Sequence, residues 1–90
     1  MIKRAIIKVR GKVQGVFFRA YCADEAQKLG LGGFAYNEPD GSVKIIGEGE
    51  EEKLRKLFSY CQSGPEFAKV DKVEVKWEEA SGEFKEFGIR

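Results

Sequence analysis

The sequence contains no histidine and no threonine, and its only asparagine is Asn37. Without histidine the chain cannot form a phosphohistidine, a Ser-His or Cys-His nucleophile pair, or a histidine-rich metal site. The two cysteines, Cys22 and Cys61, lie too far apart in sequence for a Cys-x-x-Cys redox pair or a zinc knuckle. Any catalysis is therefore expected to use arginine, lysine, asparagine, carboxylates and the backbone.

Long hydrophobic runs are also missing. No stretch reaches the ~18 apolar residues of a membrane span, and the first residues lack the apolar segment of a signal peptide, so a cytoplasmic protein is expected. The net charge of +1, from 16 basic and 15 acidic residues, does not predict the basic face that non-specific nucleic-acid binding requires. The length of 90 residues predicts one domain, 1–90, whose core needs neither a disulfide nor a metal.

The spacing of apolar residues predicts the secondary structure. Apolar and charged residues alternate over 4–10, which indicates a half-buried strand. Apolar residues then recur at helical spacing from Phe18 to Leu29, and Gly30 supplies a stop, so a helix is expected from about residue 19. The remaining elements are strands at 34–37 and 42–47, a helix opening at 50–52, a strand at 72–78, and a candidate short fifth strand at 84–89.

This order of elements, β-α-β-β-α-β with a candidate extra strand, predicts the fold class. It is typical of the α+β, ferredoxin-like βαββαβ sandwich, in which one antiparallel sheet carries two helices on one face. If the helices run antiparallel, the start of the first lies near the end of the second. Cys22 and Cys61 are then either two buried, inert thiols or, as a sharper hypothesis, a disulfide.

The loop at 11–19 (G-K-V-Q-G-V-F-F-R) connects the first strand to the first helix. Successive N–H groups beside a helix start can bind an anion. Gly15 would allow the backbone to approach such a ligand closely, and the guanidinium of Arg19 could bind two oxygens of a phosphate at once. On spacing alone, an ordinary loop with a surface arginine is the favoured interpretation. The loop has no Walker pattern. Lys28 and Phe67 stand where a phosphocysteine loop would need arginine.

The same nine residues resemble the signature of the acylphosphatases. Downstream, Gly33-Phe34-Ala35-Tyr36-Asn37 and Asp40-Gly41-Ser42-Val43 are similar to the second block of that family, with Gly49 near its end. The resemblance covers residues 4–89 and rests on two separate blocks. Tyr36 departs from the long or basic residue expected at its position, which bears on substrate preference.

The resemblance implies hydrolysis of small-molecule acyl phosphates without a metal, a cofactor or a covalent intermediate. It implies that Arg19 and Asn37 are catalytic, with Asn37 orienting the attacking water. Ser42 is a candidate to support Asn37 or the water, although a serine between a turn and a strand usually only satisfies backbone groups. The implied phosphoryl-binding residues are those of the loop, namely Gln14, Gly15, Val16, Phe17, Phe18 and Arg19. A monomer without nucleic-acid or membrane partners is expected, and the natural acyl phosphate stays open.

Two other interpretations stay in view. Taken alone, Asn37 is typical of a strand-end asparagine that pairs with the following turn. The segment 33–36 also resembles part of an aromatic RNA-binding motif, so the rival hypothesis is a non-catalytic ferredoxin-like module that binds RNA or phosphate. The acidic run at 50–52 is expected to be a solvated helix start.

Overall fold

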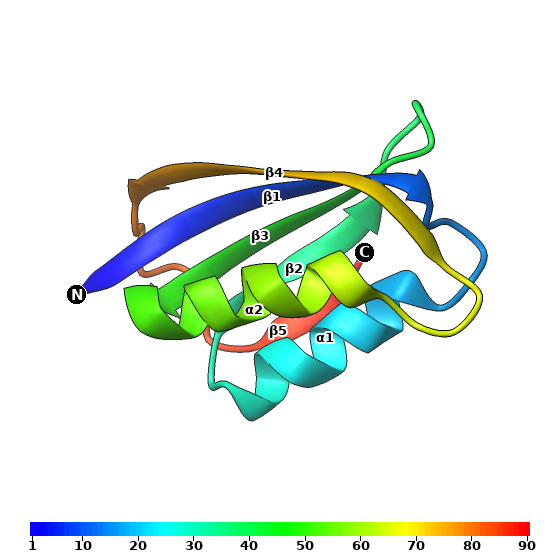
Figure 1. Ribbon diagram of the computed structural model, residues 1–90. Helices are drawn as coiled ribbons and strands as arrows, with labels where there is room; N and C mark the ends of the chain where they lie inside the picture. The colour runs from blue at the N-terminus through cyan, green and yellow to red at the C-terminus, as the bar shows by residue number, and fades with distance from the viewer.

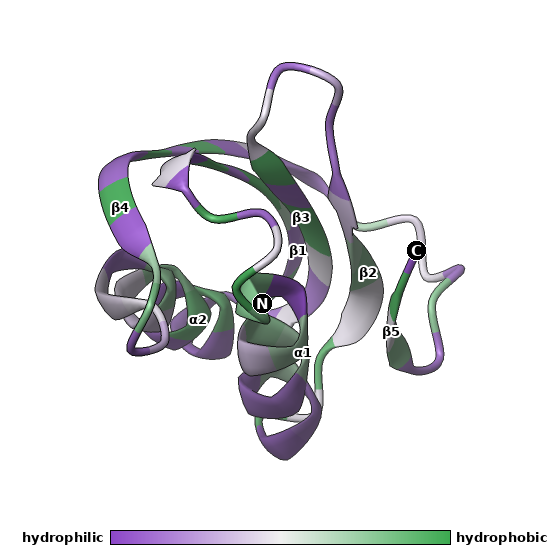
Figure 2. Ribbon diagram, turned by 90° about the vertical axis from the view of Figure 1, so that its right-hand side faces the viewer, coloured by the Kyte–Doolittle hydropathy of each residue, from purple (hydrophilic) through white to green (hydrophobic).

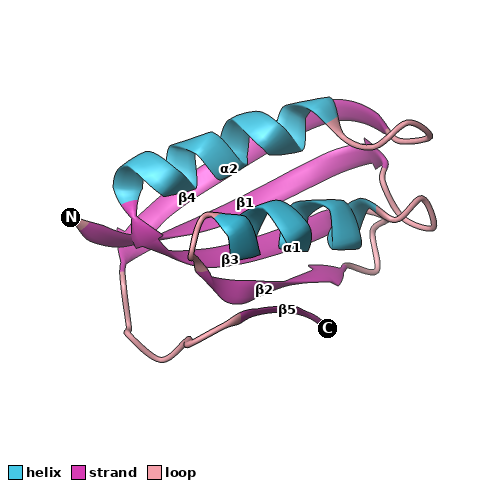
Figure 3. Cartoon of the chain, turned by 90° about the horizontal axis from the view of Figure 1, so that it is seen from below, coloured by secondary structure: helices cyan, strands magenta, loops and turns pink.

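The computed structural model describes all residues from 1 to 90 (Figure 1). The elements are β1 (Ile2–Lys12), α1 (Phe18–Lys28), β2 (Gly32–Asn37), β3 (Val43–Glu50), α2 (Glu51–Ser63), β4 (Lys69–Glu79) and β5 (Phe87–Ile89). The strands form one sheet in the order β4-β1-β3-β2-β5, and both helices cover the same face of it (Figures 1 and 3). The predicted ferredoxin-like arrangement is confirmed. Neither helix has the length and apolar character that crossing a membrane requires.

The sheet is mixed rather than wholly antiparallel. The first four strands are antiparallel to their neighbours, as predicted. The candidate fifth strand exists, but it is confined to Phe87–Ile89 and pairs in parallel with β2, opposite Gly33–Ala35. Because β4 and β5 lie at opposite edges, the segment 80–86 crosses the end of the sheet between them (Figure 3).

The core lies between the sheet and the helices. Ala5, Ile7 and Val9 have no exposed surface, because alternate residues of the central strand β1 face the helices. Leu54 and Leu57 of α2 cover them and are also fully buried, as the helical spacing predicted. This apolar layer fixes the register of β1 and therefore the position at which the chain leaves it.

The two cysteines meet inside this layer. Cys22 of α1 and Cys61 of α2 are fully buried free thiols, with 3.4 Å between their Sγ atoms. In the thiol form, the hydrogen bond with Cys61 and the burial both raise the pKa of Cys22. The expected closeness of the two helix ends is confirmed, while a disulfide between them stays a prediction.

A buried carboxylate holds the crossing segment in place. Glu48 of β3 is only 5% exposed and accepts hydrogen bonds from Arg4 Nε (2.7 Å) and from the main-chain N–H groups of Ser81 (2.8 Å) and Gly82 (3.0 Å). Burial by itself would raise the pKa of Glu48, but these hydrogen bonds outweigh it and lower that pKa. The hydrogen bonds from Ser81 and Gly82 to Glu48 therefore fix the start of the segment that leads from β4 to β5.

One end of the sheet holds the connections that follow β1 and β2, together with the last residues. β1 leaves there into the loop before α1, and β2 leaves there into the turn before β3 (Figure 1). Since β5 is parallel to β2, residue 90 arrives at the same end. Figure 2 views the molecule from this end.

Candidate active site

The loop between β1 and α1 has an alternating backbone conformation. Gly15 (φ 74°) and Phe17 (φ 63°) are left-handed, whereas Gln14, Val16 and Phe18 are not. Alternation of this kind turns successive N–H groups toward one concave side, which makes a nest for an anion. A Cβ added at Gly15 would meet nothing within 4 Å, so glycine is needed there for its positive φ and not for space.

The N–H groups of this loop are free to bind a ligand. None of the ten backbone hydrogen bonds outside the regular elements has its donor among residues 14–20. Helix α1 also starts without a side-chain cap, because its N-cap position is held by Phe17 and not by a serine, threonine or aspartate. An uncapped helix start carries unpaired donors and the positive end of the helix dipole, so it favours an anion.

Two buried side chains anchor the loop from below. Val13 and Phe18 are each 1% exposed and belong to the core. The Phe18 ring lies beneath Gly64, where a Cβ on the glycine would come within 3.2 Å of it. Of the predicted phosphoryl-binding residues, Phe18 can therefore offer only its N–H.

Gln14 ties the loop to the turn between β2 and β3. Its side-chain Nε2 donates to the main-chain oxygens of Glu38 (2.8 Å) and Ser42 (2.9 Å). The Gln14 amide is thus already engaged, and only its main-chain N–H is left for a ligand. This bridge brings the loop beside the end of β2, a positioning role that the sequence did not reveal.

Arg19 lies in the first turn of α1 and is half-buried. Its Nη1 donates to the main-chain oxygen of Arg90 at 3.0 Å. No carboxylate pairs with it, whereas Arg4, Arg10 and Arg55 all form ion pairs with carboxylates. Apart from the bond to Arg90, the N–H donors of the Arg19 guanidinium are therefore available for an incoming anion.

Arg90 is itself fixed by two contacts with β2. Its N–H donates to the main-chain oxygen of Ala35 at 2.8 Å, and its guanidinium lies 3.7 Å from the ring centroid of Phe34. The Arg90 side chain, like that of Arg19, forms no ion pair with a carboxylate side chain. The sequence did not indicate Arg90, because nothing local marks the last residues as part of a site.

Asn37 is the last residue of β2 and lies on the same side of the strand as Ala35, which faces the helices. The side-chain oxygen Oδ1 is buried and has no hydrogen-bond partner. An orphaned acceptor of this kind costs free energy in a folded protein and often marks a functional position. The alternative expectation, in which Asn37 pairs with the following turn, is wrong.

The turn after Asn37 is held by Ser42. Its hydroxyl donates to Asp40 Oδ1 (2.6 Å) and lies 3.1 Å from Glu38 Oε1, and its N–H also donates to Asp40 Oδ1 (2.9 Å). These two bonds from Ser42, helped by Lys8, hold the pKa of Asp40 well below its usual range. Ser42 makes no hydrogen bond to Asn37, so its contacts favour the local role in the turn over support of Asn37.

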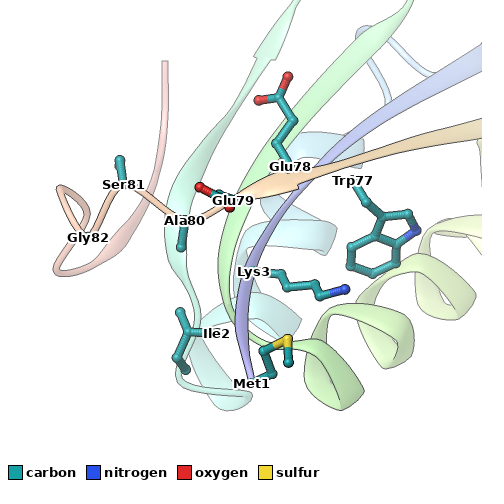
Figure 4. A pocket seen from close by; sticks show the side chains of 9 residues that line it. All are labelled: Met1, Ile2, Lys3, Trp77, Glu78, Glu79, Ala80, Ser81 and Gly82. Atoms are coloured by element: carbon teal, nitrogen blue, oxygen red, sulfur yellow. The ribbon is translucent and has the colours of Figure 1, made fainter.

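A small hollow of about 230 Å³ opens at the start of α1, lined by Val13, Gly15, Phe17, Phe18, Arg19, Ala20 and Ile89. A larger, open hollow of about 820 Å³ lies at the other end of the molecule (Figure 4). It is lined by the start of β1 and by 77–82, and it contains none of the predicted site residues.

Fold and site together define a class of protein. It is a ferredoxin-like α+β domain in which an uncapped helix start, an arginine without a carboxylate side chain beside it and an orphaned asparagine oxygen gather at one end of the sheet. Such an arrangement can bind an anion and orient a neutral polar molecule beside it.

Comparison with known proteins makes the assignment specific. The acylphosphatase family model matches residues 5–89. The chain is 44% identical over 86 residues to an acylphosphatase of Pelotomaculum thermopropionicum, covering 96% of this chain and 94% of that one. It is 47% identical over 87 residues to an acylphosphatase of Pyrobaculum calidifontis, covering 96% and 79% of the two chains.

Solved structures agree. The crystal structure of acylphosphatase from Bacillus subtilis superposes with a TM-score of 0.92 at 36% identity, covering 100% of this chain and 99% of that one. Full-length HypF in its phosphate- and nucleotide-bound form contains a similar segment, with a TM-score of 0.91 at 32% identity, although this chain spans only 12% of it. The chain belongs to the acylphosphatase family and is an enzyme of this type.

Proposed function

We propose that the enzyme hydrolyses the carboxyl-phosphate bond of acyl phosphates at the loop of residues 14–19, with Arg19 and Asn37 as catalytic residues and without a metal ion. The observation that carries the proposal is the gathering of unpaired N–H donors, an Arg19 without a carboxylate side chain beside it and the orphaned Asn37 Oδ1 at one end of the sheet. The loop N–H groups and Asn37 Oδ1 have no partner within the protein, and Arg19 has only its bond to the Arg90 oxygen, so each group can match a part of the substrate or the attacking water.

The phosphoryl group would lie in the nest between Gly15 and Arg19. The N–H groups would donate to its oxygens, and the guanidinium of Arg19 would bind two oxygens through its fork. Negative charge on those oxygens is redistributed as the bond to the leaving group weakens, so fixed donors stabilise the transition state. Removing one such donor typically costs about 3 kcal/mol of transition-state stabilisation. The positive field comes from the chain itself, which is why no metal is invoked.

The attacking water would be held by Asn37. Its buried Oδ1 accepts one hydrogen of the water and fixes the direction of the water's lone pair. Because an amide does not titrate, Asn37 orients the water but cannot act as a strong base. An acyl phosphate has a carboxylate leaving group, so a general acid is not required either.

The reaction balances as a simple in-line hydrolysis. The water oxygen forms a bond to phosphorus while the bond between phosphorus and the bridging oxygen breaks. That electron pair stays on the carboxylate, one water hydrogen stays on the product phosphate, and the other proton is released to solvent. Orientation and charge stabilisation, the two effects that this site can supply, are those on which phosphoryl transfer depends.

The test is hydrolysis of benzoyl phosphate in a chelating buffer, with the Arg19→Ala variant measured alongside. Fast loss of the acyl phosphate that survives the chelator and is nearly abolished in the variant is the expected result. Inhibition by inorganic phosphate should also weaken in the variant. Activity that disappears with the chelator would overturn the metal-free mechanism. Equal activity in both proteins would remove Arg19 from it. A folded wild-type protein without activity would favour the non-catalytic phosphate-binding module.

A further inference from the structure

We propose that Phe17 and Ile89 form a subsite for the acyl group of the substrate, which makes the enzyme selective for acyl phosphates with an aromatic or branched apolar acyl group. The inference rests on the proposed function, because it adjoins the same loop. Both residues line the hollow of about 230 Å³ that also contains Gly15 and Arg19. An apolar surface therefore begins directly beside the proposed phosphoryl site.

Phe17 is the more unusual of the two residues. It is 82% exposed, and it is also the only residue other than glycine with a positive φ. A left-handed conformation is unfavourable for an aromatic residue, and glycine or asparagine would satisfy the backbone better. Since the ring is not used in the core, the strain and the exposure both point to a role in binding.

Ile89 reaches the hollow from the other side. It is 47% exposed and lies two residues after the buried Phe87 on β5, so both side chains point to the face of the sheet that carries α1. Phe17 comes from the start of α1, whereas Ile89 comes from β5. Two exposed apolar side chains from distant parts of the chain thus meet at one small opening.

The size and position of the hollow suit a small acyl group. Its volume of about 230 Å³ is below the ~300–1,000 Å³ of sites for drug-sized ligands, so a single ring or a short branched chain fits. Asn37 does not line this hollow. The leaving group would therefore lie apart from the Asn37 side chain, which in-line displacement by a water held at Asn37 requires.

The experiment compares kcat/KM for benzoyl phosphate and acetyl phosphate in the wild type, Phe17→Gly and Ile89→Ala. Glycine is chosen at position 17 because it fits the left-handed backbone. We expect the wild type to prefer benzoyl phosphate. The ratio of the two constants should fall about tenfold in Phe17→Gly and about threefold in Ile89→Ala, the scale of a lost aromatic or aliphatic contact. Phe67→Ala is the matched control, since Phe67 is 71% exposed and does not line the hollow.

Binding measured by calorimetry separates the two proposals. Dissociation constants of benzylphosphonate and methylphosphonate report the subsite without any hydrolysis, and their ratio should shift in the same variants. An unchanged ratio in Phe17→Gly and Ile89→Ala, or an equal shift in Phe67→Ala, would overturn the subsite. A wild type that hydrolyses neither acyl phosphate would overturn the proposed function, whatever the phosphonates show.

Discussion

Nη1 of Arg19 donates a hydrogen bond to the main-chain oxygen of Arg90, at 3.0 Å, across 71 positions of the sequence. The acceptor is in turn held by β2, through the N–H of Arg90 on Ala35 and its guanidinium on the ring of Phe34. One arginine of the site is therefore oriented by the backbone of another.

Arg90→Ala should lower kcat/KM about fivefold, because losing a cation–π contact worth about 1 kcal/mol leaves the Arg90 main chain less well fixed and Arg19 less well oriented. The measurement is steady-state hydrolysis of benzoyl phosphate, with thermal unfolding followed in parallel. Arg55→Ala is a matched control, because Arg55 also stacks on an aromatic ring, at 4.8 Å from the centroid of Trp77, but lies outside the site. Similar activity losses in both variants would contradict a local role for Arg90.

Asn37→Ala should lower kcat by at least ~100-fold and leave inhibition by inorganic phosphate nearly unchanged, because it removes orientation of the water and not phosphoryl binding. The variant should also be no less stable than the wild type, since the orphaned Oδ1 makes no hydrogen bond within the protein. Steady-state kinetics measures the expected loss of kcat, and chemical denaturation measures the expected unchanged stability. Near-normal turnover would show that Asn37 does not orient the water.

Gln14→Ala should destabilise the protein by about 2 kcal/mol, because the main-chain oxygens of Glu38 and Ser42 each lose one of their two donors. Turnover should fall as well, because the loop would no longer be held beside Asn37. Urea denaturation and benzoyl phosphate hydrolysis measure the two effects. Gln62→Ala is the control, since Gln62 is exposed and its side chain makes no hydrogen bond. The bridge would be unimportant if both glutamine variants behaved alike.

Stability should fall below about pH 4.5 through Glu48. Its pKa in the folded protein is lowered from the ordinary value of 4.5, so the folded state binds the proton less readily than the unfolded state. The contribution of Glu48 is therefore complete above that ordinary value and is lost as the pH falls through the lower folded pKa. Glu48→Gln should cost about 2 kcal/mol at neutral pH and flatten the acid part of the stability curve. Urea denaturation at a series of pH values tests this. If the free energy of unfolding fell equally steeply with decreasing pH in the wild type and in Glu48→Gln, the prediction would be contradicted.

The sequence predicted the fold well because the main elements depend on local pattern. Alternation over 4–10 and the helical spacing of Leu54, Leu57 and Cys61 correspond to faces that are fully buried. The ends of elements were less predictable. β1 runs from Ile2 to Lys12, because pairing with β3 and β4 extends it beyond the alternating apolar residues.

Only part of the candidate site could be predicted from the sequence. Arg19 and Asn37 belong to motifs and could be named in advance. Arg90, Ile89 and the side-chain role of Gln14 depend on contacts between segments far apart in the chain, which no local pattern specifies. The parallel pairing of a three-residue strand is a tertiary feature of the same kind.

For Cys22 and Cys61, the sequence predicted that the two side chains lie close together, but it did not predict whether they are thiols or a disulfide. Counting thiols in denaturant without reductant decides it, because two free thiols exclude the disulfide.

β5 has a consequence for how the enzyme loses activity on heating. Only three residues pair with β2, and a ladder this short can detach in a local opening that leaves the central strands intact. Such an opening would remove both the acceptor of Arg19 and the Ile89 wall of the hollow. Function would then fade at a lower temperature than the fold, and amide hydrogens of β5 would exchange long before those of β1. The edge of the sheet, and not its centre, would set the working range of the enzyme.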